Sequence, residues 1–182
     1  MDLSIIQLHD LSFQPMITEA EIKKTVKALA EDLQTRYAGK RPIFLPILNG
    51  SYIFAADLSR EMNIDLEMSF IKLSSYKGTE STGDLSQLIG LQESLKDRPV
   101  IIIEDIIDTG RTLNRLIPEL QKLNPSSIEV IALLFKPDAL QAELNAKYLV
   151  GFEIPNKFVV GYGLDYNGLG RNLKDIYQLV DE

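Results

Sequence analysis

The stretch Val100–Leu113, V-I-I-I-E-D-I-I-D-T-G-R-T-L, contains the features that decide the fold. Its first four residues are consecutive apolar β-formers, the pattern of a strand buried on both faces within a parallel sheet. Beyond it the apolar residues follow helical spacing, at positions 113, 116, 117, 120 and 123. A buried strand followed at once by a helix is the repeating unit of α/β proteins, so this stretch predicts that fold class.

Three acids and a polar turn separate this strand from the helix. Glu104 and Asp105 end the strand, and Asp108 follows three residues later. The turn that leads into the helix is Thr109-Gly110-Arg111-Thr112. Ligands of open α/β sheets bind beyond the carboxyl ends of the strands, against the next helix's N-terminus. The turn would present backbone N–H groups, two hydroxyls and a guanidinium to a phosphate, and the acids could bind sugar hydroxyls.

A purely structural alternative is a strand-to-helix turn capped by Asp108 or Thr109. It explains three carboxylates after an apolar strand less well, because a charge placed there needs a partner. A Walker A loop is excluded, since the required glycine–lysine spacing is absent.

Strands and helices alternate through most of the chain, which predicts a doubly wound, mostly parallel sheet flanked by helices. Thr18–Glu21 forms a capping box, and apolar residues at helical spacing continue the helix to Tyr37. Further helices are expected at 51–62 and 139–144, and strands at 43–48, 64–70, 128–135, 148–154, 158–163 and 176–180. The strand-rich C-terminal part predicts a small hood beside the sheet. We expect one domain, 1–182, with a core at about 17–135 and a hood formed by 1–16 and 136–182.

The run Glu104–Gly110, E-D-I-I-D-T-G, resembles the phosphoribosyl-pyrophosphate (PRPP) motif of type I phosphoribosyltransferases, in the form found in the hypoxanthine-guanine branch. Other stretches between Leu48 and Arg171 resemble the same family in the expected order. The resemblance implies a purine-salvage enzyme that transfers the phosphoribosyl group of PRPP to N9 of hypoxanthine or guanine. IMP or GMP and pyrophosphate would be the products, and Mg²⁺ the cofactor.

The resemblance also implies roles for residues around the donor. Glu104 and Asp105 would lie near the ribose hydroxyls and hold Mg²⁺ together with Asp165, while the turn at 109–112 would bind phosphate. Asp108 would act as the general base that takes the proton from N7 of the purine. Arg171 would contact the pyrophosphate.

Leu48-Asn49-Gly50-Ser51 resembles the family's pyrophosphate loop, often built with a cis peptide between its first two residues. Asn49 replaces the usual Lys or Arg, so the resemblance extends to the backbone of Asn49 and Gly50. The structural alternative is a plain β-turn, because Asn-Gly is a favoured turn pair.

Lys136, Phe158, Val159 and Asp165 form the implied purine site. Lys136 would donate to the 6-oxo group, Phe158 would stack on the base, and the backbone of Val159 would read its edge. A solvated lysine at a strand end and an ordinary core phenylalanine are the structural alternatives. Ser75 and Tyr76 open a polar stretch, 74–86, that resembles the family's mobile flap; a loop without function is the alternative.

Composition narrows the alternatives. The chain of 182 residues has a net charge of −7, which argues against a nucleic-acid-binding regulator on the same fold, because such a protein needs a basic face. It has no cysteine, no signal-peptide pattern and no apolar run long enough for a membrane span, so we expect a cytoplasmic enzyme without membrane partners. Relative preference among hypoxanthine, guanine and xanthine stays open, and the resemblance implies a homodimer or homotetramer.

Overall fold

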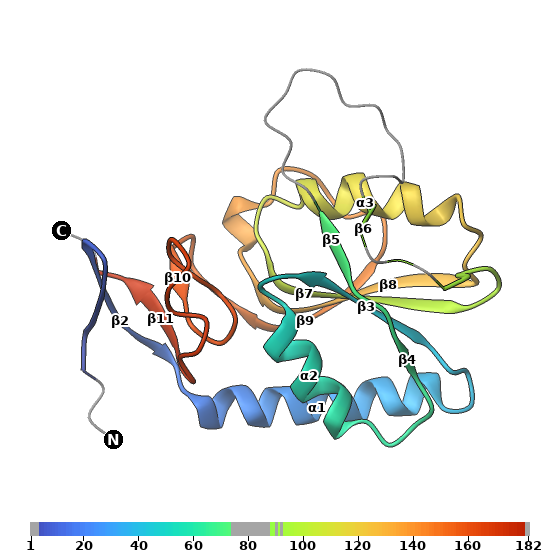
Figure 1. Ribbon diagram of the computed structural model, residues 1–182, viewed down its shortest axis with the longest axis horizontal. Coiled ribbons are helices and arrows are strands. Elements are labelled where there is room, and N and C mark those ends of the chain that lie inside the picture. The colour runs from blue at the N-terminus through green and yellow to red at the C-terminus, as the bar shows by residue number, and fades with distance from the viewer. Residues whose placement is uncertain (1–3, 74–87, 90, 92, 181–182) are drawn as a thin grey trace.

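The computed structural model describes residues 4–73, 88–89, 91 and 93–180 (Figure 1). Within these residues the chain forms a large, mainly parallel sheet with helices on both faces and a smaller antiparallel sheet at one end. Ser75 and Tyr76, the predicted flap residues, lie outside the described residues. Among the described residues, no helix combines the length and apolar character that crossing a bilayer requires.

The large sheet has the PRPP-like strand near its centre. Its strands lie in the order β6 (Leu88–Ile89), β5 (Ile71–Leu73), β3 (Ile43–Leu48), β7 (Pro99–Ile107), β8 (Ser127–Phe135) and β9 (Lys147–Glu153), with β4 (Glu67–Met68) beside the start of β3. All described pairs are parallel except β5 with β6. The single strand predicted at 64–70 is replaced by two short strands. Of these, β4 pairs with the first half of β3 and β5 with its end.

Alternate residues of the central strands enter two separate hydrophobic clusters, one on each face. Ile101 and Ile103 pack with α1 (Glu19–Tyr37) and α2 (Tyr52–Glu61) on one face. Val100 and Ile102 pack with α3 (Arg111–Gln121) on the other. Figure 1 shows the same layers, with α3 on the side of the sheet opposite α1 and α2. The predicted doubly wound fold is confirmed.

Helix α1 begins where its sequence predicts. Thr18 and Glu21 form the complete capping box, since Thr18 Oγ1 accepts from the backbone of Glu21 and the Glu21 carboxylate accepts from the backbone of Thr18. The buried face contains the residues at helical spacing, Ile22, Val26, Leu29, Leu33 and Tyr37.

The small sheet forms the hood. Its strands lie in the order β1 (Ile6–Leu8), β2 (Leu11–Ile17), β11 (Ile176–Leu179) and β10 (Val159–Val160), all antiparallel. The first and last strands of the described chain, β1 and β11, thus both belong to this sheet (Figure 1). The division into a core at about 17–135 and a hood formed by 1–16 and 136–182 stays a prediction. Strand β9 lies within the second hood range but pairs with β8, so it belongs to the large sheet.

Two predicted elements differ from the structure. The strand expected at 158–163 is only two residues long, because residues 161 to 163 have φ values of 102°, 48° and 104°, outside the extended region. The helical turn expected at 139–144 is instead a single 3₁₀ turn, η2 (Pro137–Ala139).

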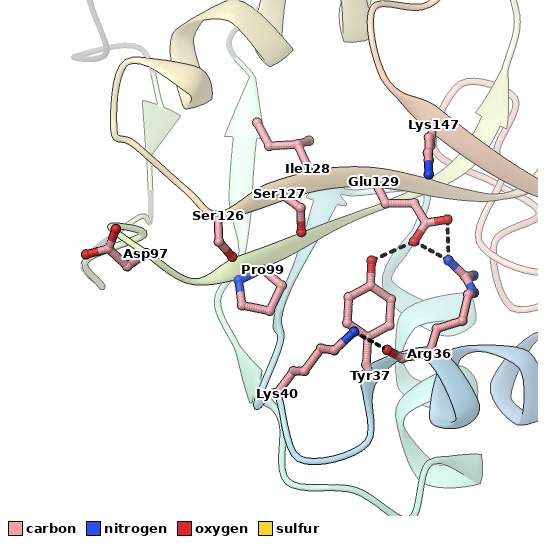
Figure 2. Close-up of a pocket in the computed structure, with 10 residues that line it drawn as sticks. All are labelled: Arg36, Tyr37, Lys40, Asp97, Pro99, Ser126, Ser127, Ile128, Glu129 and Lys147. Atoms are coloured by element: carbon pink, nitrogen blue, oxygen red, sulfur yellow. Dashed lines mark hydrogen bonds and ion pairs between the residues drawn. The ribbon is translucent and has the colours of Figure 1, made fainter.

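A buried ionic cluster ties α1 to β8 at the amino-terminal edge of the sheet (Figure 2). Arg36 Nη1 donates to Glu129 Oε1 at 2.6 Å, and the Tyr37 hydroxyl donates to Oε2 at 2.6 Å. Burial, and after it the Glu129 carboxylate, raise the pKa of Tyr37, so its hydroxyl remains a donor. The polar atoms that Glu129 brings into the protein are thereby satisfied.

Replacing Tyr37 with phenylalanine should lower the free energy of unfolding by about 1–3 kcal/mol, since a hydrogen bond to a buried charge is lost. Urea unfolding would measure it, with Tyr148→Phe, an exposed ring on β9, as the control. Equal stability of the two variants would contradict a stabilising role for the cluster.

Candidate active site

Glu104 is buried and Asp105 partly buried near the end of β7, which continues past them to Ile107 rather than ending at them as predicted. Glu104 is 8% exposed, and burial, reinforced by the neighbouring Asp105 charge, raises the pKa of Glu104 well above 4.5. Burial also raises the pKa of Asp105 to about 6, against the opposing effect of the Ile106 backbone N–H that donates to its carboxylate at 2.8 Å. A cation or hydrogen-bond donors brought by a ligand would stabilise the charged form of both carboxylates.

The polar turn forms a small phosphate-sized hollow of about 70 Å³ next to these acids. It is lined by Glu104, Ile106, Ile107, Asp108, Thr109, Gly110, Thr112 and Leu113. Gly110 has φ 76° and immediately precedes α3, so the backbone N–H groups that begin the helix face this turn. The φ of Gly110 favours glycine, because side-chain-bearing residues rarely adopt that conformation.

The end of β8 places Lys136 beside Asp108. The Lys136 backbone N–H donates to the Ile107 carbonyl at 2.9 Å, which extends the pairing of β7 and β8. Its Nζ then lies 2.9 Å from Asp108 Oδ2, with Lys136 buried and Asp108 half exposed. A buried ammonium and an accessible carboxylate therefore form one pair at the mouth of the turn.

The end of β3 approaches the same place. The Leu48–Asn49 peptide is cis, as the resemblance implies, and Asn49 itself is exposed. Gly50 lies against Asp105, because a Cβ added to Gly50 would overlap the Asp105 carboxylate. The neighbouring hood loop is equally close, since a Cβ on Gly163 would overlap the Gly50 carbonyl oxygen.

Arg171 and Asp165 are bound to each other rather than open to a ligand. Arg171 Nη2 lies 2.6 Å from Asp165 Oδ1, and Nη1 donates to the Gly163 carbonyl at 2.6 Å. The other Asp165 oxygen accepts from the Gly168 backbone at 2.7 Å. The predicted roles of both residues at pyrophosphate or metal stay predictions.

Phe158 lies at the hood rather than in the core. Its ring is 43% exposed and contacts Phe13 and Tyr166 edge-on or tilted, with centroids 6.1 and 5.8 Å apart. Val159 is buried in β10. An exposed aromatic ring held by two other rings is suited to stacking on a planar ligand.

Glu104 and Asp105 fit a divalent cation chemically, because Mg²⁺ prefers carboxylate oxygens and their burial disfavours uncompensated negative charge. Across the described part of the chain, however, no three His, Cys, Asp or Glu side chains are grouped to hold a metal ion. A magnesium ion here would take its other ligands from substrate oxygens and water, its usual habit.

A larger hollow of about 930 Å³ lies at the opposite edge of the sheet, where β7, β8 and β9 begin (Figure 2). Its main charged groups already bind one another: Glu129 is held by Arg36 and Tyr37, and Lys40 donates to the Arg36 carbonyl at 2.7 Å. The carboxyl edge, with its unneutralised acids and phosphate turn, is the better candidate for chemistry.

Sequence reasoning missed two contacts at this edge, the Gly50–Gly163 approach and a hydrogen bond from Tyr162 to Asp57. Glycines at 161 and 163 within an apolar run were the available signal for close backbone approach.

The geometry defines a class: an α/β protein with partly buried acids and a phosphate-sized turn where the carboxyl ends of its parallel strands meet a hood. Residues 16–167 match the family described as "Phosphoribosyl transferase domain". The chain is 41% identical over 176 residues to the hypoxanthine-guanine phosphoribosyltransferase of Staphylococcus aureus. The aligned region covers 96% of this chain and 98% of that protein.

Solved structures agree. The crystal structure of a hypoxanthine phosphoribosyltransferase from S. aureus superposes with a TM-score of 0.82 and 43% identity, over 91% of this chain and 90% of that one. A hypoxanthine-guanine phosphoribosyltransferase from Bacillus anthracis gives a TM-score of 0.81 and 35% identity, over 91% and 96%. The chain therefore belongs to the hypoxanthine-guanine phosphoribosyltransferases, within the phosphoribosyltransferase family, and the enzyme class predicted from its motifs is confirmed.

Proposed function

We propose that this enzyme serves purine salvage, transferring the 5-phosphoribosyl group of PRPP to N9 of hypoxanthine or guanine to give IMP or GMP and pyrophosphate. The observation that carries the choice of base is the Lys136–Asp108 pair, 2.9 Å apart beside the phosphate turn. O6 and N7 of a 6-oxopurine lie side by side on one edge, whereas adenine has an amino donor in place of O6. The Lys136 ammonium can donate to O6 of a 6-oxopurine while the Asp108 carboxylate accepts from N7–H. With adenine, the ammonium would face an amino group that is itself a donor.

The chain's own residues supply binding and proton transfer. Backbone N–H groups and hydroxyls at 109–112 would hold phosphate, and Glu104 and Asp105 would bind the ribose hydroxyls and Mg²⁺. When bound, the cation offsets charge on the pyrophosphate leaving group.

Asp108 would take the proton from N7 while N9 bonds to the anomeric carbon and the bond from that carbon to pyrophosphate breaks. Because Asp108 is half exposed, its carboxylate can reach a ligand while it stays beside the buried Lys136 ammonium. The supporting feature is geometry: the proton acceptor Asp108 and the base-reading donor Lys136 directly follow the adjacent strands β7 and β8.

A parallel spectrophotometric assay with PRPP, Mg²⁺ and hypoxanthine, guanine, xanthine or adenine tests the proposal. Turnover of hypoxanthine or guanine without adenine is expected, and dominant turnover of xanthine would make this a xanthine-preferring transferase. No turnover of any base, by folded protein that still binds PRPP, would favour the nucleic-acid-binding regulator. The cytoplasmic location and the homodimer or homotetramer stay predictions.

Lys136→Met should raise the KM for hypoxanthine about 5- to 100-fold, which corresponds to the loss of one hydrogen bond from a charged donor. The variant should also discriminate less between hypoxanthine and adenine in kcat/KM. Steady-state kinetics with both bases would measure this. Lys147→Met, an exposed lysine at the opposite edge, is the matched control. An unchanged ratio of hypoxanthine to adenine turnover would remove Lys136 from base selection.

A further inference from the structure

We infer that the hydrogen bond between Tyr162 and Asp57 fixes the purine-binding wall of the hood relative to the pyrophosphate loop, so that both residues are positioning residues for phosphoribosyl transfer. This inference rests on the proposed function. Neither residue has a role among the PRPP and purine contacts described above.

The bond joins the two elements that must be aligned. Tyr162 lies between β10, which carries Val159, and the loop that carries Asp165. Its hydroxyl donates to Asp57 Oδ2 at 2.7 Å. Asp57 lies in α2, which starts at Tyr52, two residues beyond Gly50 of the pyrophosphate loop. One hydrogen bond thus connects the base side of the site with the pyrophosphate side, across 105 residues of sequence.

There is little free space between these two sides. The residue after Tyr162 is Gly163, where a Cβ would overlap the Gly50 carbonyl oxygen, and a Cβ on Gly50 would overlap the Asp105 carboxylate. The hood loop, the turn after β3 and the Asp105 side chain of β7 are therefore in direct contact. A movement of the Tyr162 segment must displace Gly50 or Asp105, because close-packed interiors transmit strain.

The bond is built to persist. Tyr162 is 6% exposed and packs in the same hydrophobic cluster as Phe54 and Leu58 of α2. Its backbone N–H donates to the Leu173 carbonyl at 2.9 Å, so the segment is held on both sides. Burial, and after it the Asp57 carboxylate, raise the pKa of Tyr162, and the phenol stays a donor to a charged acceptor, the stronger kind of hydrogen bond.

Tyr162→Phe keeps the ring and its packing but removes the donor. We expect kcat for hypoxanthine to fall on the order of tenfold, since misplacement of about 1 Å can cost about a hundredfold in rate. The KM values for hypoxanthine and PRPP should change less than about threefold, because each substrate keeps its own contacts.

Tyr37→Phe is the matched control, because it removes a buried phenol–carboxylate bond of 2.6 Å at the far edge of the sheet. It should lower Tm with kcat unchanged. Asp57→Asn retains an acceptor oxygen and should keep most of the turnover, whereas Asp57→Ala should lose as much as Tyr162→Phe. The double variant Asp57→Ala/Tyr162→Phe should be no slower than the slower single variant.

A Tyr162→Phe enzyme with wild-type kcat and a lowered Tm would overturn the inference and leave a structural bond only. If that variant does not fold, the comparison of Asp57→Asn with Asp57→Ala decides, and equal kcat in those two overturns it as well. Failure of the proposed function is a separate result, because it appears as absent turnover in the wild-type enzyme.

Discussion

Asp108→Asn should lower kcat for hypoxanthine by about 10²- to 10⁴-fold, the usual contribution of a positioned general base. Asparagine keeps the size of the side chain but cannot accept the N7 proton. The dissociation constant for PRPP should stay within about threefold, because the phosphate turn keeps its backbone N–H groups. Steady-state kinetics and calorimetric titration of PRPP with Mg²⁺ would separate the two effects.

The control for this variant is Asp138→Asn, an exposed acid two residues beyond Lys136 in η2. It should show wild-type kinetics. Because Asp108 is half exposed, its replacement should not unfold the protein, and circular dichroism can check this. A loss of PRPP affinity equal to the loss of turnover would assign Asp108 to donor binding and not to proton transfer.

Asp105→Asn should have opposite effects on binding and on stability. The affinity for PRPP with Mg²⁺ should fall about 10- to 100-fold, because a charged acceptor for the donor and its cation is lost. The ligand-free protein should instead become more stable at neutral pH. Burial of the Asp105 carboxylate raises its pKa because the charged form is disfavoured, and asparagine carries no charge.

The pH dependence gives the sign of this effect. The pKa of Asp105 is raised from 3.8 to about 6 on folding, so between these values the folded protein binds more protons than the unfolded chain. This carboxyl therefore makes the free energy of unfolding fall as pH rises from about 4 to about 6, by up to about 3 kcal/mol. The asparagine variant lacks this contribution.

Urea unfolding of both proteins without ligand, at several pH values between 4 and 8, would measure the difference. The stability advantage of Asp105→Asn should grow from near zero at pH 4 to its full size above pH 6. A difference that is constant over the whole range would show that Asp105 is not a buried, strained charge. Asp138→Asn again serves as the control.

The strand–acid–turn–helix segment was readable from sequence because all of its information is local. Val100 to Ile103 alternate between the two faces of the sheet because a strand has a period of two. The buried face of the helix from Leu113 follows from a period of 3.6. The predicted family and the doubly wound sheet are confirmed for the same reason: several local patterns agree in order.

The contacts between elements were not readable. Arg36 meets Glu129 and Tyr162 meets Asp57 across 93 and 105 residues, and no periodicity specifies such pairs. The site predictions for Asp165 and Arg171 named residues that the structure brings together, but bound to each other. Sequence patterns indicate which groups are chemically suitable, whereas partner choice depends on the packed arrangement.

The most direct measurement is a crystal structure with Mg²⁺, PRPP and a hypoxanthine analogue that has carbon in place of N9 and cannot react. We predict the 6-oxo group at Lys136 Nζ, N7–H at the Asp108 carboxylate and a phosphate of the donor in the turn at 109–112. Binding of the donor or the analogue in the hollow around Arg36, Lys40 and Glu129, or a purine whose N7 edge faces away from Asp108, would contradict the account.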